Sequence, residues 1–484
     1  MTRPVLIGWS QVSRYDGEPL DAWAEAVSRA GVAVKAIDSL DVVYCQSWPY
    51  DEPARRLAER IGATPRRTEY SGIGGTTPLS LLGAAAERIR SGRSDVAAVV
   101  GGEALATVRR LKKAGQRPEW SYRDPVKRPF PFEAPFHPSE LAHQVFQAYT
   151  TFALRDVARR AHRGVTPDDY RRAIGRLFAP MTEVAAANRH AWFPVARTAT
   201  ELTEVTPANR MVAYPYTKLV TAIMDVDLAA AFVVASEEAA DRLGVPADQR
   251  VYLRGWAEDR DPDYVAEHAD LWRSPAMAGT LHGALTRAGV GVDDIARFDL
   301  YSCFPASVAF SLDALGLDAG DDRGPFTVTG GLPYAGGPGS GYAIGAVAAM
   351  ADALVADPGS LGLVSAVGMH LSKHAAAVMS TDPGAGPGAP AGPVDQETVA
   401  IAGPVDGPAT IAAYTVHHGA DGEPTDALLV CDLGDPADRA DPAGRPARAY
   451  ARSTDPAFMR DLEQQEMVGS PVTLRADGEV NTAF

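Results

Sequence analysis

The first part of the chain alternates between short apolar runs and amphipathic stretches. VLIGW, LDVVYCQ and DVAAVVGG are apolar without polar alternation, whereas LDAWAEAVSRAG and PARRLAERIG between them repeat apolar residues at helical spacing. Buried parallel strands joined by crossover helices give this pattern. It returns after residue 250 in VYLRGWA, MAGTLHGALTRAG, ARFDLYSCF and LGLVSAVGM. The sequence therefore predicts an α/β fold.

An internal duplication is predicted from two longer segments. GIGGTTPLSLLGAAAERIRSGRSDVAAVVGGE, residues 72–103, reads as a Gly-rich turn, a small-residue helix, a polar turn and a buried strand. GGPGSGYAIGAVAAMADALVADPGSLGLVSAVG, residues 336–368, repeats that order at similar length. Two related halves are expected, with their Ala-rich helices packed closely in the middle of the protein.

Three further regions differ from these halves. Residues 105–215 are rich in Pro and aromatic residues and then helical, which indicates a lid inserted in a first half spanning 1–240. The second half spans 250–382 and is followed by a Pro/Gly linker at 383–394. Residues 395–484 contain strand-like runs and one helical stretch, which predicts a small β domain with an OB-like barrel as the expected form.

Composition narrows the classes of partner. The formal net charge of −15 disfavours nucleic acid and anionic lipid over most of the surface. We expect no membrane-spanning segment, and the start MTRPVLIGWSQ reads as a strand, so a cytoplasmic location is expected. Cys45, Cys303 and Cys431 lie far apart in the sequence, which supports neither disulfides nor a metal site.

Four segments in family order resemble the thiolase superfamily. They are the turn, helix and strand ending in Gly101, Gly102 and Glu103; YSCFPASV, which looks like the HDCF segment of sterol-carrier-type thiolases; GGLPYAGGPGSGYA, which looks like the GHP loop; and AVGMHLSKH in the place of the CxG loop. With its β-rich tail, the chain is similar to bacterial thiolase-like proteins of type 1. The resemblance implies a duplicated thiolase fold, two βαβαβ-type halves in an αβαβα body.

The resemblance also indicates which reactive groups have changed. The nucleophilic cysteine of thiolases falls at Gly75, the oxyanion histidine at Gly337 and the second cysteine at Ala366. Glycine cannot attack a thioester. The first HDCF position is Tyr301, and Cys303 is retained. Tyr301 and His374 are the acid or base candidates, Cys303 is a candidate relocated nucleophile, and Thr76 and Thr77 are expected to cap the following helix.

Three functions stay open at this point. The family implies an acyltransferase of acyl-CoA and lipid metabolism, similar to acetyl-CoA acetyltransferase. Loss of the cysteine favours a noncatalytic CoA or acyl-CoA binder. A branch of the superfamily that also lacks the cysteine acts as retro-aldolases on acyl-CoA thioesters, and its members resemble this chain in having tyrosine at the position of Tyr301.

Basic residues suggest where CoA phosphates would bind. They are Arg109, Arg110, Lys112, Lys113, Lys127 and Arg128 in the lid segment, and Lys218 beyond it. A solvated basic helix face is the alternative. No tightly bound cofactor is expected beyond CoA or acyl-CoA as a ligand, and the resemblance leaves a homodimer or an OB-fold partner protein open.

Overall fold

The computed structural model describes residues 2–126, 136–434 and 447–484. The first half contains nine of the elements used below: β1 (Pro4–Ser13), α1 (Pro19–Arg29), β2 (Ser39–Val42), α2 (Pro53–Ile61), β3 (Arg67–Tyr70), α3 (Thr77–Arg90), β4 (Val96–Ala104), β7 (Asp227–Ser236) and α9 (Glu237–Arg242). The second half contains β8 (Val251–Arg260), α10 (Pro275–Ala288), β9 (Ile295–Asp299), α11 (Pro305–Leu315), α12 (Tyr342–Ala356), β10 (Leu361–Gly368) and β11 (Lys373–Ser380).

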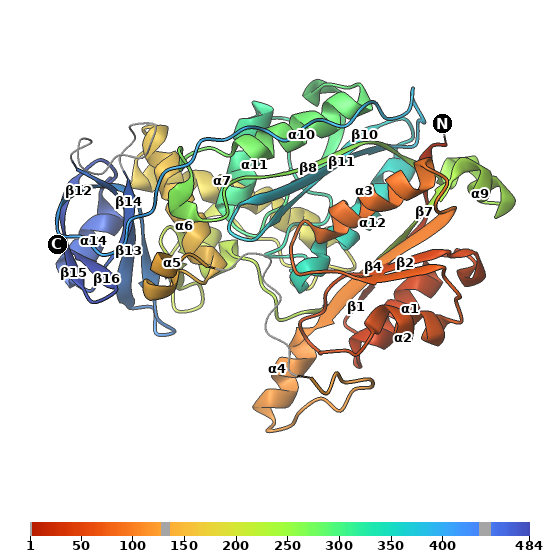
Figure 1. Cartoon of the computed structure of the whole chain (residues 1–484), viewed down its shortest axis with the longest axis horizontal. Helices are drawn as coiled ribbons and strands as arrows, with labels where there is room; N and C mark the ends of the chain where they lie inside the picture. The colour runs from red at the N-terminus through yellow and green to blue at the C-terminus, as the bar shows by residue number, and fades with distance from the viewer. Residues whose placement is uncertain (1, 127–135, 435–446) are drawn as a thin grey trace.

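The two halves form the predicted layered body. The large sheet has the order β3-β2-β4-β7-β1-β8-β11-β10-β9, and its two halves are joined by only two residue pairs between β1 and β8. Helices α3 and α12 lie between the strands of the two halves, and α1, α2 and α10 cover the outer faces (Figure 1). The predicted α/β duplication is confirmed, and α3–β4 corresponds in order to α12–β10.

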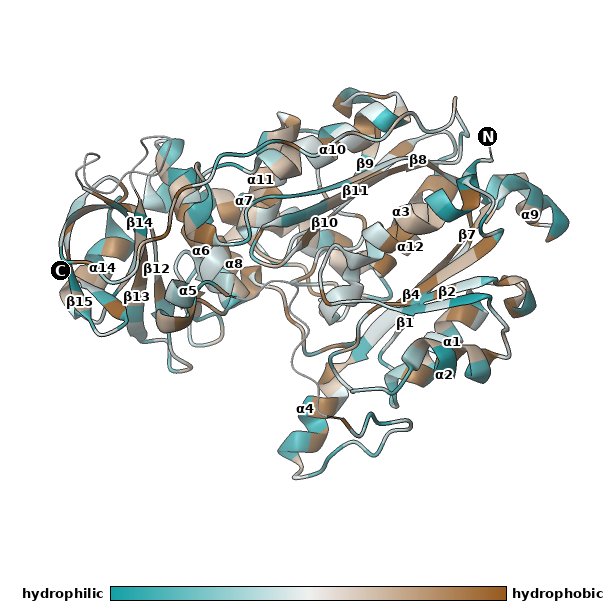
Figure 2. Cartoon of the chain, viewed as in Figure 1, coloured by the Kyte–Doolittle hydropathy of each residue, from teal (hydrophilic) through white to brown (hydrophobic). Residues whose placement is uncertain are grey.

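Burial explains why the central helices are rich in small residues. α12 is buried along most of its length, and its Ala343, Ala346 and Ala351 have no exposed surface. Figure 2 shows hydrophobic residues concentrated in strands such as β7 and hydrophilic ones in peripheral helices such as α9. Close approach of α3 and α12 to both halves of the large sheet requires such short side chains.

One helix of the body has the length and composition of a membrane-crossing helix. Residues Gly339–Ala356 have the length and hydropathy that a membrane-crossing helix needs. This segment includes α12, however, and 61% of it is buried inside the protein. A helix that is hydrophobic on most sides and packed between the two halves of the large sheet is a core helix by position.

The lid segment is mostly helical. It contains α4 (Leu105–Lys113), α5 (Pro138–Ala142), α6 (Ala148–His162), α7 (Pro167–Ala187), α8 (Ala199–Thr203), β5 (Met211–Ala213) and β6 (Tyr216–Thr217). Its last two strands leave the body and join the sheet of the C-terminal region, where β5 pairs with β12. The lid is therefore shared between the thiolase-type body and the tail.

The C-terminal strands close on themselves. They are β12 (Gly407–His418), β13 (Pro424–Leu433), β14 (Arg448–Ser453), β15 (Pro471–Asp477) and β16 (Val480–Ala483), with α14 (Pro456–Gln464) between β14 and β15. The order β13-β14-β16-β15-β12, together with the β12–β13 pairing, makes a five-stranded barrel. Arg160 of α6 fixes it to the lid through the hydroxyls of Tyr214 and Tyr414, both at 2.7 Å.

The predicted linker lies along the body. The amide of Gly388 donates to the carbonyl of Arg287 at 2.7 Å, and the amide of Val394 donates to the carboxylate of Asp259 at 2.8 Å. Figure 1 shows this segment passing over α10 toward the barrel. It contains no helix or strand between residues 383 and 394.

Candidate functional site

A cavity of about 740 Å³ opens between the two halves beneath the lid. Four loops of the body contribute to its wall, and they are the four segments singled out in the sequence. Their lining residues include Ile73, Gly74, Gly75, Tyr301, Cys303, Phe304, Leu332, Gly337, Gly339, Ser340, Val367, Gly368 and Met369. This volume lies in the ordinary range for small-molecule sites. The structure thus brings Gly75, Tyr301, Cys303 and Gly337 to one cavity.

Gly75 has no room for a side chain. A Cβ atom there would overlap the carbonyl oxygen of Val367 and lie 2.5 Å from the hydroxyl oxygen of Tyr301. The neighbouring amide of Gly74 donates to Ser340 Oγ at 3.0 Å, which ties the turn of the first half to the Gly-rich loop of the second. The space beyond the Gly75 Cα is therefore filled by Tyr301 and by backbone.

Tyr301 is held in this place by its own environment. It follows β9, its amide donates to Ser365 Oγ at 3.0 Å, and its ring meets the ring of Tyr342 edge-on at 5.5 Å between centroids. Tyr342 in turn donates to Asp299 at 3.0 Å. Burial, and secondarily Cys303, raises the pKa of the Tyr301 phenol well above its ordinary value. The hydroxyl therefore keeps its proton at neutral pH, and that proton can be donated in a hydrogen bond.

The thiol of Cys303 is not activated as a nucleophile by its surroundings. Its side chain is 8% exposed although the residue borders the cavity, and burial raises the pKa of its thiol far above the usual range. Nucleophilic attack requires the thiolate. The geometry places Cys303 near Tyr301 but does not activate it.

The second Gly-rich loop is closed by backbone contacts. The amide of Gly337 donates to the carbonyl of Ile223 at 3.0 Å, so it is not free to bind a substrate oxygen. Gly339 adopts a φ of +54°, and a Cβ there would lie 2.8 Å from Glu103. Glu103 accepts hydrogen bonds from the amides of Gln46 at 2.7 Å and Ser47 at 2.8 Å. Glycine is thus required where this loop passes over the buried carboxylate.

His374 does not join Tyr301. It lies on β11, is 2% exposed, and its Nε2 is 3.0 Å from Asp261 and 3.1 Å from Ser274. Burial alone would raise the pKa of Asp261, but the hydrogen bond with His374 and the charge of Arg155 hold it below its usual range. His374 borders a separate cavity of about 520 Å³ on the other side of the Gly75 turn.

The helix-capping expectation is not met by Thr76. Thr76 precedes α3, but its side chain makes no capping hydrogen bond. Its backbone carbonyl instead accepts from the amides of Leu79 and Ser80, both at 3.0 Å. Thr77 is the first residue of the helix itself.

The basic residues divide into two groups. Arg109 and Lys218 border the cavity, and Arg109 forms an ion pair with Asp225, which also borders it. Arg110, Lys112 and Lys113 are exposed on α4 and do not line the cavity. Lys127 and Arg128 lie outside the described residues. The cavity mouth is therefore cationic on one side, with further cations beyond it.

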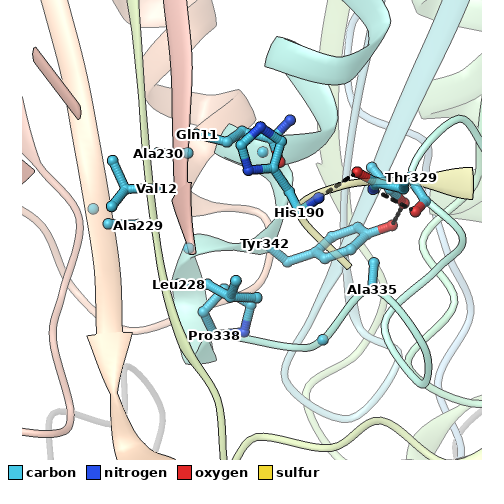
Figure 3. A pocket seen from close by; sticks show the side chains of 15 residues that line it. Gln11, Val12, His190, Leu228, Ala229, Ala230, Thr329, Ala335, Pro338 and Tyr342 are labelled. Atoms are coloured by element: carbon cyan, nitrogen blue, oxygen red, sulfur yellow. Dashed lines mark hydrogen bonds between the residues drawn. The ribbon is translucent and has the colours of Figure 1, made fainter. Parts of the chain in front are cut away.

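A smaller pocket lies behind Tyr342. Figure 3 shows Gln11, His190, Thr329 and Tyr342 around a space of about 30 Å³, with Thr329 Oγ1 at 2.6 Å from the Tyr342 hydroxyl. A space of this size holds roughly one or two water molecules. The larger cavity is therefore the candidate ligand site.

Comparison with solved structures gives the family. The chain is similar to the crystal structure of a monomeric SCP2-thiolase-like protein type 1 from Mycobacterium smegmatis, at 30% identity and a TM-score of 0.83, over 100% of this chain and 98% of that one. This chain belongs to the SCP2-thiolase-like type 1 branch of the thiolase superfamily. No protein-family model and no curated protein matches it.

Two more distant structures share the thiolase fold with this thiolase-like chain. Acetyl-CoA acetyltransferase from Syntrophomonas wolfei has 16% identity and a TM-score of 0.55 over 79% of this chain and 99% of that one. Human mitochondrial 3-ketoacyl-CoA thiolase has 14% identity and a TM-score of 0.56 over 78% and 99%. Both leave about a fifth of this chain unmatched, whereas the type 1 protein covers all of it.

Several cavity residues of this thiolase-like chain escaped the sequence analysis. Arg210 adds a third cation to the wall, and Tyr149 and Phe152 of α6 add aromatic surface. They come from the lid, where no motif indicates which side chains turn inward. Within the described residues, no group of three or more His, Cys, Asp or Glu side chains could hold a metal ion.

Proposed function

We propose that this chain binds a CoA thioester in the 740 Å³ cavity without forming a covalent acyl-enzyme. The observation that carries the proposal is the contact between Gly75 and Tyr301. The position that resembles the thiolase nucleophile has no side chain, and the phenol of Tyr301 together with the Val367 carbonyl occupies the space that one would need. The cavity between the two halves is present, but the position that resembles the thiolase nucleophile offers no side chain to accept an acyl group.

The distribution of polar groups supports a thioester as the ligand. Tyr301 presents a protonated hydroxyl deep in the cavity, where it can donate to a carbonyl oxygen. Phe152, Phe304 and Leu332 give apolar surface for the acyl part. Arg109, Arg210 and Lys218 line the same cavity, and cations bind phosphate oxygens through charge-assisted hydrogen bonds.

A calorimetric titration with acetoacetyl-CoA tests the proposal. A matched pair of variants identifies the site: Ala148→Trp fills the cavity from the start of α6, whereas Ala247→Trp adds the same side chain at an exposed position elsewhere. Saturable binding to the wild type and to Ala247→Trp, lost in Ala148→Trp, supports the cavity as the site. Equal binding by all three proteins would place the ligand elsewhere and overturn the proposal.

Cleavage of a carbon–carbon bond is a second candidate, favoured by the Tyr301 phenol at the cavity wall. A retro-aldol step needs a donor to the thioester carbonyl and a base for the β-hydroxyl proton. Tyr301 fits the donor role, since its raised pKa disfavours the phenolate. Release of an aldehyde or ketone from a 3-hydroxyacyl-CoA, abolished by Tyr301→Phe, would support this candidate. Unchanged substrate after prolonged incubation would exclude carbon–carbon bond cleavage and leave noncovalent thioester binding as the proposed function.

A further inference from the structure

The segment around α4 has the opposite charge to the rest of the chain. Residues 104–123 contain one acidic residue and six basic ones, in a protein with 61 Asp and Glu against 46 Lys and Arg. The basic ones are Arg109, Arg110, Lys112, Lys113, Arg117 and Arg123. Such an asymmetry produces a local positive field on an otherwise acidic surface, and that field attracts anionic partners.

Helix α4 connects this charge to the cavity. It begins directly after β4, whose Glu103 lines the cavity, and Arg109 on its second turn lines it as well. Lys112 and Lys113 follow three and four positions later, so they share the helix face of Arg109. One turn advances about 5.4 Å along the axis. A stripe of cations therefore leads outward from the cavity mouth.

The stripe is exposed and its base is anchored. Figure 1 shows α4 projecting from the body, away from both halves of the large sheet. Arg109 pairs with Asp225, and Arg110 pairs with Asp16 at 2.7 Å, so ion pairs to other elements hold the helix. Lys112 and Lys113 are exposed and form no ion pair with any residue of the described chain. The outer cations remain available to a partner.

The position of these cations suggests an occupant larger than CoA. Arg109, Arg210 and Lys218 line the cavity and bind the CoA phosphates in the proposed function, whereas Lys112 and Lys113 do not line it. An anionic membrane is a poorer match, because helices that lie on membranes expose large apolar side chains. No exposed large apolar side chain of the described chain belongs to α4.

We infer that α4 is the docking helix for an acidic carrier protein that presents its thioester on a phosphopantetheine arm. The arm has the same pantetheine thioester as an acyl-CoA, so it can enter the same cavity while the carrier's acidic surface meets Lys112 and Lys113. The inference rests on the proposed binding of a thioester in that cavity.

The test compares two forms of one acyl group. Binding of a bacterial acyl carrier protein loaded with an acetoacetyl thioester, and of acetoacetyl-CoA, is measured for the full-length wild type and for Lys112→Glu/Lys113→Glu. Arg171→Glu/Arg172→Glu on α7 is the matched control, since those two arginines are also adjacent and exposed. Anionic vesicles with a phosphatidylserine fraction serve as a further probe.

The expected result is at least roughly tenfold weaker carrier binding in the α4 variant at low salt, with acetoacetyl-CoA affinity within about threefold of wild type and no change in the α7 control. Wild-type binding to acetoacetyl-CoA but not to the carrier would overturn the inference and leave the proposed function standing. Binding to neither would overturn both. Vesicle binding lost in the α4 variant, without carrier binding, would assign the helix to a lipid surface and overturn the inference.

Discussion

Ionisable groups in the interior of the cavity are buried, whereas those at its rim, Arg109, Lys218 and the neighbouring cations of α4, are exposed. Inside, Tyr301, Cys303 and Glu103 are buried, and burial raises the pKa of each. At the rim, Arg109, Lys218 and the α4 cations are exposed to solvent. The interior thus favours neutral groups and the rim favours anions, as the proposed binding of a CoA thioester requires.

The same comparison explains why the site lacks an activated nucleophile. Activation of a thiol or hydroxyl needs a nearby cation or base inside the cavity. His374 Nε2 lies 3.0 Å from Asp261, behind the Gly75 turn. This arrangement agrees with the proposed noncovalent binding of a thioester.

The largest predicted effect comes from placing a cysteine in the interior. Gly75→Cys should lower the free energy of unfolding by about 3 kcal/mol or more, because the Val367 carbonyl is backbone and cannot rotate away. Urea unfolding measures this, with Gly320→Ala as the control, since a Cβ at Gly320 meets nothing within 4 Å. A stable Gly75→Cys protein that is acylated by acetyl-CoA would contradict our description of this turn.

A second effect concerns a buried histidine beside the cavity wall. His370 follows Met369, its Nδ1 lies 3.1 Å from Thr151 Oγ1, and burial lowers the pKa of its ring from 6.5 to about 4. The folded state therefore binds fewer protons than the unfolded state between these values. Its contribution to stability is complete above about pH 6.5 and is lost as the pH falls through about 4.

His370→Asn should remove this pH dependence while keeping a polar group near Thr151. The wild type should lose up to about 3 kcal/mol more stability than the variant between roughly pH 7 and pH 4. Parallel urea titrations at several pH values measure the difference. Identical pH profiles for the two proteins would show that His370 is not held neutral.

A smaller effect is expected from removing the interior hydrogen-bond donor. Tyr301→Phe should weaken acetoacetyl-CoA binding by about fivefold, the usual value of one neutral hydrogen bond. Unfolding free energy should change by less than about 1 kcal/mol, since the ring still packs against Tyr342. Unchanged affinity, measured by calorimetry, would remove Tyr301 from the binding site.

The smallest effect is expected at the rim. Lys218→Ala should weaken CoA binding by about threefold at low salt and less at high salt, because an exposed charge is screened. Binding of an acetoacetyl-pantetheine thioester without the nucleotide should not change. Lys35→Ala is the matched control at another exposed lysine. Equal losses for both ligands would mean that Lys218 acts on the acyl part.

The sequence predicted those site residues whose position follows from the order of strands and helices in the duplicated fold. Gly75, Tyr301, Cys303 and Gly337 follow strands or precede helices of the two repeated units, so the duplicated fold brings them together. The Pro/Gly composition of residues 383–394 did not reveal that their amides bond to β8 and α10. The composition of a segment indicates how flexible it would be in isolation, but it does not indicate which parts of the folded protein the segment contacts.

His374 and Arg210 show what the sequence could not determine. Side chains along a strand alternate between faces, so proximity of His374 to a matched loop did not fix the face of β11 from which it projects. It points toward Asp261 and the second cavity. Arg210 reaches the cavity from the lid, whose packing depends on contacts distant in sequence.

One combined measurement tests the central claim most directly. The full-length protein is titrated with acetoacetyl-CoA in a calorimeter, and the same sample is then denatured and its intact mass determined. Our account predicts saturable binding with about one ligand per chain and an unchanged protein mass. A mass increase equal to one acyl group would contradict noncovalent binding, and absence of binding would contradict the assignment of the cavity to a CoA thioester.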